Sequence, residues 1–243
     1  MATIKDKQKK AKARSHKRDL QREELFVPYR RVPVELLLKL MSSVKKGELR
    51  FLDIGAGEGL ISQAVLEKFP KAKATCIDRD EGTVKRGAER LRHFGVRVQF
   101  IMADIDKSGW AEDLHKTYNI VVSAYTLSHI DDDKKECVYR RIYEVLDPGG
   151  ALFVLDRVSS PSPEAEKLYE AIREEHVRQK LEVKLEEKLP KKEFHEIFAA
   201  APGSDTSLSA PLENQLRMLT QIGFKNVDCY WKFLNFALFG GYK

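Results

Sequence analysis

Apolar runs of strand length recur along the chain and alternate with helical patterns. The runs cover residues 49–54, 73–78, 97–102, 119–124 and 151–156. Apolar residues at helical spacing lie between or around them, over residues 32–44, 60–69, 81–94, about 131–146 and 212–222. Glycine or Asp-Pro-Gly-Gly follows several of these helical patterns, as is typical of helix ends. Strands and helices that alternate in this way predict βαβ units and a parallel sheet.

Two more strand-like runs close the sequence, over residues 226–233 and 236–243. Their separation is too short for a crossover connection, so we predict that they form an antiparallel hairpin. Earlier in the chain, residues 161–198 have a highly charged helical pattern where a core layer is not expected. We predict that this segment is either a lid over a functional site or a solvated connector.

The composition indicates a globular protein with one principal domain. The chain has 243 residues, 42% of them apolar, which is long enough to bury a core. No apolar run approaches the ~20 residues of a membrane helix, and the lysine-rich N-terminus lacks the apolar segment of a secretory signal. The three scattered cysteines predict neither a disulfide framework nor a metal site. We therefore expect a cytoplasmic protein with no metal and no membrane partner.

The positive charge of the chain is concentrated near its N-terminus. Residues 1–31 hold 11 of the 43 Lys and Arg residues but only 4 of the 37 Asp and Glu residues. We therefore divide the chain into a basic extension over residues 1–24 and a domain over residues 25–243, with a helical insertion at about 161–200. The extension could bind RNA or another polyanion. The alternative is a solvated extension, because no aromatic residue is interleaved with its charges before Phe26.

A glycine-rich turn, "DIGAGEGL", follows the first predicted strand. Gly55 and Gly57 fit the dinucleotide-binding pattern G-x-G-x-x-G, but Leu60 stands at its third glycine position and the glycine comes one residue early, at Gly59. Glycine lets a ligand approach the backbone closely, since a side chain would block it. We predict that Gly55 and Gly57 contact a bound ligand.

An aspartate stands at or just beyond the end of each of the first three strands: Asp53, Asp78 and Asp104. The carboxyl ends of parallel strands form the ligand-binding edge of such a sheet. Asp78 can accept hydrogen bonds from both hydroxyls of a ribose, and Asp104 can accept one from the amine of an adenine. Asp53 either contacts the ligand or braces the turn. An acidic site of this kind suits an adenosyl ligand with an amino-acid tail and a sulfonium cation, and it disfavours phosphate.

These motifs resemble those of the class I S-adenosylmethionine-dependent methyltransferases. "LDIGAGEG", "CIDRD", "ADI", "NIVVSAYTLSHI" and "LDPGGALFVLD" match in order and spacing, and the resemblance covers roughly residues 32–243. It implies a Rossmann-like, three-layer α/β sandwich whose seven-stranded, mostly parallel sheet ends in the antiparallel hairpin. It also implies S-adenosyl-L-methionine as cofactor. The implied cofactor-binding residues are Asp53, Gly55, Ala56, Gly57, Asp78, Arg79, Asp104, Ile105 and Ser123.

The segment after the fourth strand is expected to line the transfer site. Family members that methylate exocyclic amines of bases carry a D/N-P-P-aromatic motif there, and those that methylate pyrimidine carbon use a cysteine near a proline. "SAYT", residues 123–126, has neither. The segment resembles the small-molecule branch, where it is apolar and often ends in histidine. We predict catalytic roles for His129, as a general base, and for Tyr125, as part of the pocket; packing roles are the alternatives.

The predicted function is transfer of a methyl group to an oxygen, nitrogen or sulfur atom of a small molecule by direct displacement. Tyr29 and Arg30 are candidate substrate contacts, since related enzymes often place an aromatic or arginine residue just before the first helix. One alternative is an RNA methyltransferase that uses the basic extension. Another is a carboxy-S-adenosylmethionine enzyme, which would need a basic residue for the extra carboxylate. A third is a protein that binds the cofactor without catalysis.

Overall fold

The computed structural model describes residues 29–44, 48–112, 114, 117–186, 188–199 and 208–243. The chain divides into two compact units. The larger comprises residues 32–161 and 206–243, and the smaller comprises residues 162–205 together with the chain up to residue 31. The basic extension predicted for residues 1–24 lies outside the described residues.

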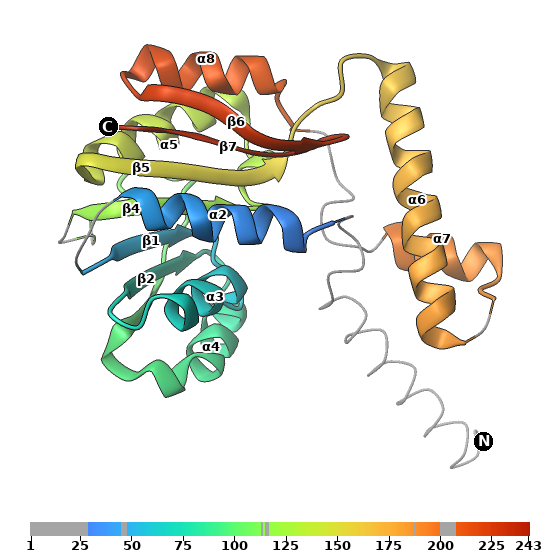
Figure 1. Ribbon diagram of the computed structural model, residues 1–243, viewed down its shortest axis with the longest axis horizontal. Helices are drawn as coiled ribbons and strands as arrows, with labels where there is room; N and C mark the ends of the chain where they lie inside the picture. Colours follow the sequence, from blue (N-terminus) through green and yellow to red (C-terminus); the bar gives the residue numbers. More distant parts are fainter. Residues whose placement is uncertain (1–28, 45–47, 113, 115–116, 187, 200–207) are drawn as a thin grey trace. The chain divides into compact units, whose positions relative to one another are not determined.

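The larger unit is built on a seven-stranded sheet with the order β3-β2-β1-β4-β5-β7-β6 (Figure 1). The strands are β1 (Arg50–Ile54), β2 (Lys73–Asp78), β3 (Val98–Met102), β4 (Tyr118–Ala124), β5 (Leu146–Arg157), β6 (Lys225–Phe233) and β7 (Phe236–Tyr242). Strands β1 to β5 pair in parallel, whereas β7 is antiparallel to both β5 and β6. The predicted α/β fold, with its closing hairpin, is confirmed.

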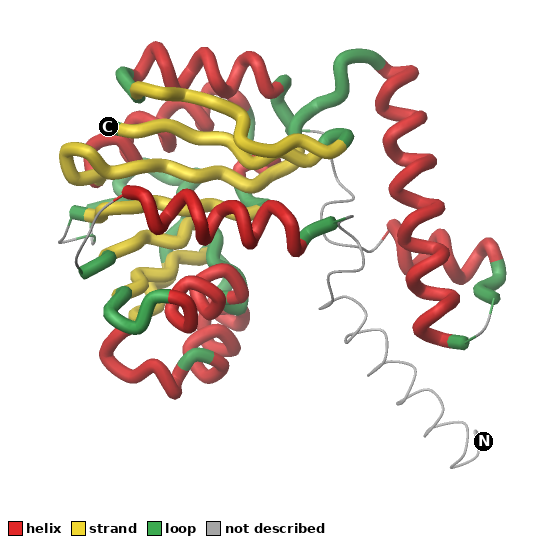
Figure 2. The backbone as a smooth tube through the Cα atoms, viewed as in Figure 1, coloured by secondary structure: helices red, strands yellow, loops and turns green. Residues whose placement is uncertain are grey.

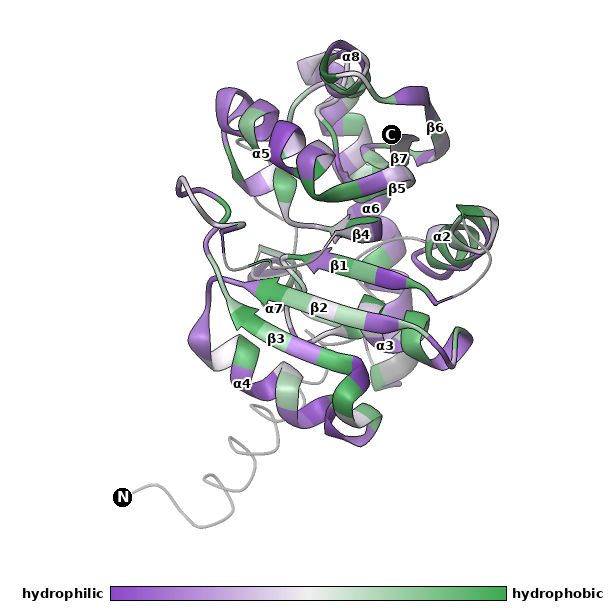
Figure 3. Ribbon diagram, turned by 90° about the vertical axis from the view of Figure 1, so that its left-hand side faces the viewer, coloured by the Kyte–Doolittle hydropathy of each residue, from purple (hydrophilic) through white to green (hydrophobic). Residues whose placement is uncertain are grey.

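Helices cover both faces of this sheet (Figure 2). The helices are α2 (Arg31–Val44), α3 (Leu60–Lys68), α4 (Glu81–Arg90), α5 (Asp132–Val145) and α8 (Leu212–Ile222). Alternation along β1 sends Phe51 into a core with Leu37 of α2 and Val65 of α3. Its neighbour Leu52 enters the opposite core, which contains side chains of α5 and α8. Figure 3 shows the hydrophobic segments of β1, β2 and β3 side by side in the sheet.

Two boundaries differ from the sequence prediction by more than one residue. The helix expected to reach Phe94 ends at Arg90, and a 3-10 helix over Arg92–Arg97 follows it. Between the two helices, Leu91 is fully buried and holds the chain against the sheet. The strand expected from Ala151 begins at Leu146, because Leu146 pairs with Tyr118 of β4; the Asp-Pro-Gly-Gly segment lies within a shift in register between that pair and the pair of Ile120 with Ala151.

The edge strand β6 is irregular. Its pairing with β7 shifts register between Lys225 and Asp228 and again between Cys229 and Trp231. Lys225 and Lys232 are exposed on this strand. The edge therefore presents an interrupted ladder of backbone groups and two lysine side chains.

The smaller unit contains α6 (Pro163–Leu185) and α7 (Lys191–Ala199). Ser162 caps α6, since its side chain accepts a hydrogen bond from the Ala165 backbone N–H at 3.2 Å. The helices share a small apolar core of Val177, Leu181, Leu189 and Phe194. The helical prediction for this segment is confirmed, while its role as a lid stays a prediction.

Candidate functional site

The glycine turn, residues 55–59, links β1 to α3 with its three glycines at positive φ, between 57° and 76°. The turn is fixed by a hydrogen bond from the Ala56 N–H to the Ile77 carbonyl, 2.9 Å long. A Cβ on Gly55 would lie 2.1 Å from Oγ1 of Thr126, whereas a Cβ on Gly57 would meet nothing within 4 Å. Gly55 therefore permits close packing inside the protein, and Gly57 leaves an open side on the turn.

Asp78 and Asp104 lie at the carboxyl ends of adjacent strands. The backbone N–H of Ala103 donates to the Asp78 carbonyl at 3.0 Å, which joins the two strand ends. The Asp78 carboxylate accepts hydrogen bonds from the N–H of Gly57 at 2.9 Å and of Asp80 at 3.0 Å. The Asp104 carboxylate accepts one from the N–H of Asp106 at 3.1 Å. Both side chains are half-buried, and each carboxylate oxygen has a further lone pair for a ligand.

Asp53 is a supporting residue, because only 1% of its surface is exposed. Its Oδ2 accepts a hydrogen bond of 2.6 Å from the hydroxyl of Ser62 in α3. The same hydroxyl lies 3.1 Å from Sγ of Cys76 in β2. Burial raises the pKa of Asp53 to about 6, and the Ser62 hydrogen bonds partly oppose that shift. Of the two roles expected for Asp53, these contacts support bracing of the turn.

The remaining predicted cofactor residues occupy different environments. Ser123 is fully buried and donates a hydrogen bond of 3.1 Å to the Ile54 carbonyl, so it joins β4 to β1. Ala56 and Ile105 are half-buried and pack against the two opposite cores. Arg79 is exposed beside Asp78. The structure thus brings Gly57, Asp78 and Asp104 to one edge and places Ser123 behind it.

The β4 loop, residues 125–129, starts with an unusual backbone. Tyr125 has a φ of 55°, in the left-handed region that non-glycine residues rarely adopt. Its N–H donates to the Leu155 carbonyl at 2.8 Å, and its ring packs edge-on against Phe236 with centroids 6.3 Å apart. His129 ends a 3-10 turn in this loop and is exposed. A general base must lie within hydrogen-bond reach of the atom that it deprotonates, so the catalytic roles of His129 and Tyr125 stay predictions.

Asp156, at the end of β5, organises the β4 loop and was missed from the sequence. It is 1% exposed and accepts hydrogen bonds from the backbone N–H of Thr126 and of Ser128. Burial raises the pKa of Asp156, and its hydrogen bonds oppose that shift. The signal that marked Asp53 and Asp78, an acid at the end of an apolar run, is also present in "LFVLD" and could have found it.

Tyr29 and Arg30 belong to the smaller unit, so their predicted role as substrate contacts stays a prediction. The Tyr29 ring lies 5.6 Å from the ring of His176 in α6. Burial lowers the pKa of His176, and the nearby Lys180 lowers it further. These contacts are internal to the unit.

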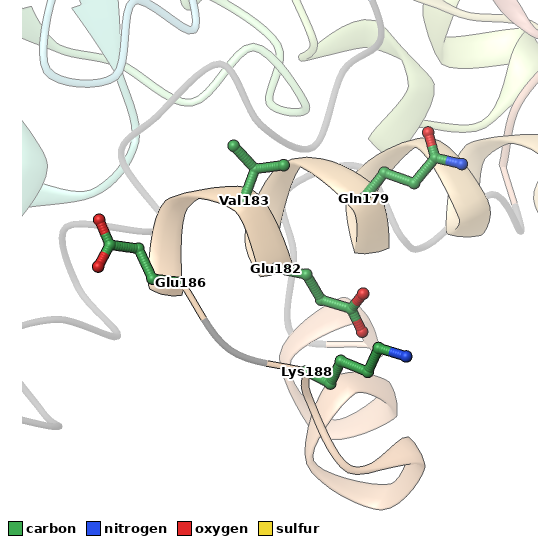
Figure 4. Close-up of a pocket in the computed structure, with 5 residues that line it drawn as sticks. All are labelled: Gln179, Glu182, Val183, Glu186 and Lys188. Carbon is green, nitrogen blue, oxygen red and sulfur yellow. The ribbon is translucent and has the colours of Figure 1, made fainter.

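A shallow depression lies at the end of α6 (Figure 4). It is lined by Gln179, Glu182, Val183, Glu186 and Lys188. Glu182 and Lys188 point the same way, and Val183 points away from them. None of the predicted site residues lines this depression.

A family model described as a methyltransferase domain matches residues 51–150. This range contains the glycine turn, the three strand-end aspartates and the β4 loop. The chain contains a class I methyltransferase domain. The enzyme depends on S-adenosylmethionine, as the resemblance in the sequence implied. None of the helices that the structure describes has the length and apolar character of a membrane span.

Known proteins similar to the enzyme differ in how much they share with it. The carboxy-S-adenosyl-L-methionine synthase of Nautilia profundicola is 22% identical over 89% of this chain and 87% of its own. Malonyl-[acyl-carrier protein] O-methyltransferase 1 of Ilyobacter polytropus is 27% identical over 47% of this chain and 40% of its own. The crystal structure of a putative O-methyltransferase from Nostoc punctiforme superposes with a TM-score of 0.59 at 21% identity. That match covers 87% of this chain but 56% of the other, so the enzyme spans about half the length of the O-methyltransferases it matches.

Proposed function

We propose that the enzyme transfers the methyl group of S-adenosylmethionine to an oxygen, nitrogen or sulfur atom of a small molecule. One observation carries this proposal: the carboxyl edge of the sheet joins an open glycine turn and two half-buried carboxylates to a β4 loop without cysteine or proline. Such a loop suits direct displacement, because it offers no cysteine thiol for a covalent intermediate.

The residues of the edge suit the cofactor in three ways. Gly57 leaves its side of the turn open for the amino-acid end. Asp78 and Asp104 keep lone pairs for the ribose hydroxyls and the adenine amine. The negative charge of these carboxylates favours a sulfonium cation. When bound, S-adenosylmethionine supplies an electrophilic methyl group.

On the acceptor side, the chain contributes position and a proton acceptor. In this proposal Tyr125 lines the pocket and His129 takes the proton that the acceptor atom loses. Alignment of acceptor and methyl donor contributes up to ~7–11 kcal/mol to such reactions. A well-placed base adds about 10²–10⁴-fold.

An acceptor screen tests this proposal. Purified enzyme is incubated with S-adenosylmethionine and pools of small-molecule alcohols, carboxylic acids, amines and thiols, and release of S-adenosylhomocysteine is measured. We expect release that depends on one pool, with the methylated product visible by mass spectrometry. Release that is equal with and without every pool would contradict the proposal.

A second candidate is a carboxy-S-adenosylmethionine enzyme. The observation that favours it is the match to the Nautilia profundicola synthase along most of both chains. Arg157 is a candidate for the basic residue that this reading needs, since it directly follows Asp156 at the end of β5. Mass spectrometry of the ligand that co-purifies discriminates the two: a carboxylated cofactor retained by the wild type and lost in Arg157→Gln favours this second candidate.

The RNA methyltransferase alternative depends on residues 1–24, which lie outside the described residues. It predicts that RNA binding weakens steeply as salt is raised. A full-length enzyme with no RNA affinity at low salt excludes it.

A further inference from the structure

We propose that Asp156 is a positioning residue whose carboxylate clamps the β4 loop against the glycine turn. The inference rests on the proposed function of that loop as the acceptor side of the site. In this proposal one buried side chain fixes how the glycine turn, on the cofactor side, meets the β4 loop, on the acceptor side. Asp156 itself acts through the loop and not on the reacting atoms.

The first argument is the set of hydrogen bonds that Asp156 accepts. Oδ2 accepts from the backbone N–H of Thr126 at 3.0 Å and of Ser128 at 3.1 Å. Oδ1 accepts from the Ser128 hydroxyl and from the backbone N–H of Arg157, both at 2.7 Å. Both oxygens are thus engaged, and three of the four donors belong to the β4 loop. A buried carboxylate with so many donors fixes their positions, since each would be costly to leave unpaired.

The second argument is the contact between the β4 loop and the glycine turn. The Thr126 hydroxyl lies 3.3 Å from the Gly55 carbonyl oxygen and 3.1 Å from that of Ala124. The Thr126 side chain also fills the space that a Cβ on Gly55 would need. Because Asp156 holds the Thr126 backbone, it also fixes how this side chain meets the turn.

The third argument is the backbone strain at Tyr125. A tyrosine at a φ of 55° persists only where its surroundings impose that conformation. The Leu155 carbonyl holds its N–H, and Asp156 holds the residue that follows it. Two adjacent residues of β5 therefore impose the strained turn that aims the Tyr125 side chain.

The test compares Asp156→Asn with Asn119→Ala in the full-length enzyme. The asparagine keeps the shape of the side chain but replaces one acceptor oxygen by an amide that faces donors. Asn119 is also buried and polar, and it lies in β4 at the end opposite the loop, where it bonds Arg50 and Asp147. Asn119→Ala thus controls for a general loss of stability.

Two measurements need no acceptor. Amide hydrogen exchange reports protection of the Thr126 and Ser128 N–H groups, and titration with S-adenosylhomocysteine reports the affinity of the cofactor side. In Asp156→Asn we expect exchange of both amides to rise about tenfold and the affinity to fall by about three- to tenfold. Asn119→Ala should lower the melting temperature and leave both readouts at wild-type values.

The turnover of any acceptor that the screen identifies adds a third readout. Asp156→Asn should lower kcat more than it raises KM for S-adenosylmethionine, because the loop faces the acceptor. Unchanged amide protection in Asp156→Asn, or equal effects in both variants, overturns the clamp even where the enzyme methylates an acceptor. A screen without any product contradicts the proposed function and leaves the exchange and affinity tests in force.

If Asp156→Asn does not fold, Ser128→Ala gives the decisive result. It removes only the hydroxyl hydrogen bond to Oδ1 and leaves the backbone donors in place. We expect a smaller effect in the same direction, about threefold in exchange of the Thr126 and Ser128 amides. Exchange equal to that of the wild type in Ser128→Ala would then overturn the clamp.

Discussion

The two sides of the site hold their carboxylates in different ways. On the cofactor side, Asp78 and Asp104 are half-buried and accept hydrogen bonds from the backbone two residues further along the chain. On the acceptor side, Asp156 is buried and accepts from residues 28 to 30 positions earlier. The half-buried carboxylates keep lone pairs that can accept hydrogen bonds from a ligand, whereas the buried carboxylate accepts its hydrogen bonds from the protein. We therefore propose that the half-buried acids bind the cofactor and that the buried acid holds the β4 loop in place.

The sharpest test of this contrast is His129, the exposed candidate on the acceptor side. If it is the base, His129→Gln should lower kcat by about 10²–10⁴-fold at neutral pH, because no other group replaces the proton acceptor. Affinity for S-adenosylhomocysteine should stay unchanged. The matched control is His93→Gln, which alters an exposed histidine in the 3-10 helix before β3. Equal turnover in the two variants would contradict the role of His129 as the general base.

Asp78→Ala should lower the affinity for S-adenosylhomocysteine by about 10–100-fold, measured by calorimetric titration. The reason is the loss of an acceptor for two hydroxyls and of the bond to Gly57. Asp80→Ala is the control, because Asp80 is exposed and caps α4 through the Thr83 N–H. It should weaken the start of α4 and lower the melting temperature slightly, with little change in affinity. Equal affinities in the two variants would contradict the role of Asp78 in cofactor binding.

Gly55→Ala and Gly57→Ala sharpen the comparison within the turn. Gly55→Ala should lower the free energy of unfolding by about 1–3 kcal/mol, since its Cβ overlaps Thr126 at a strained φ. Gly57→Ala has the strain without the overlap and should lose less stability, about 1 kcal/mol. Denaturant unfolding measures both. Titration with S-adenosylhomocysteine should show that Gly57→Ala loses more affinity than Gly55→Ala, relative to the stability that each variant loses.

The pH dependence of stability tests the brace beneath the turn. Folding raises the pKa of Asp53 from 3.8 to about 6, so the folded state binds this proton more tightly than the unfolded state does. Its contribution is therefore full below about pH 4 and is lost as the pH rises through 6, on the order of 1–3 kcal/mol. Asp53→Asn should reduce the change of the unfolding midpoint with pH between pH 4 and 6. Exposed Asp133→Asn should keep the wild-type slope.

Most of the fold could be predicted because its signals are local. The period of apolar residues located every strand of the sheet, and the glycine turn marked the ligand edge. The helix expected to reach Phe94 ended early because Leu91 packs beside Gly59 and Phe100, a contact between distant segments. The start of β5 at Leu146 likewise depends on pairing with Tyr118.

The candidate site was predictable in part for the same reason. Asp78 and Asp104 each accept a hydrogen bond from the backbone two residues further on, and their position at strand ends marks both in the sequence. Asp156 also stands at the end of an apolar run, but no local pattern shows that its carboxylate bonds Thr126, 30 residues earlier. Ser123 lies near the end of β4 and resembles a ligand contact in sequence, but its hydroxyl donates to the Ile54 carbonyl inside the sheet.

The irregular strand β6 bears on how the enzyme behaves at high concentration. A regular exposed edge can recruit a strand from another molecule and start aggregation. The two register shifts interrupt that template, and Lys225 and Lys232 add like charges that repel a second copy. We therefore expect this edge of the sheet to resist edge-to-edge association when the enzyme is concentrated.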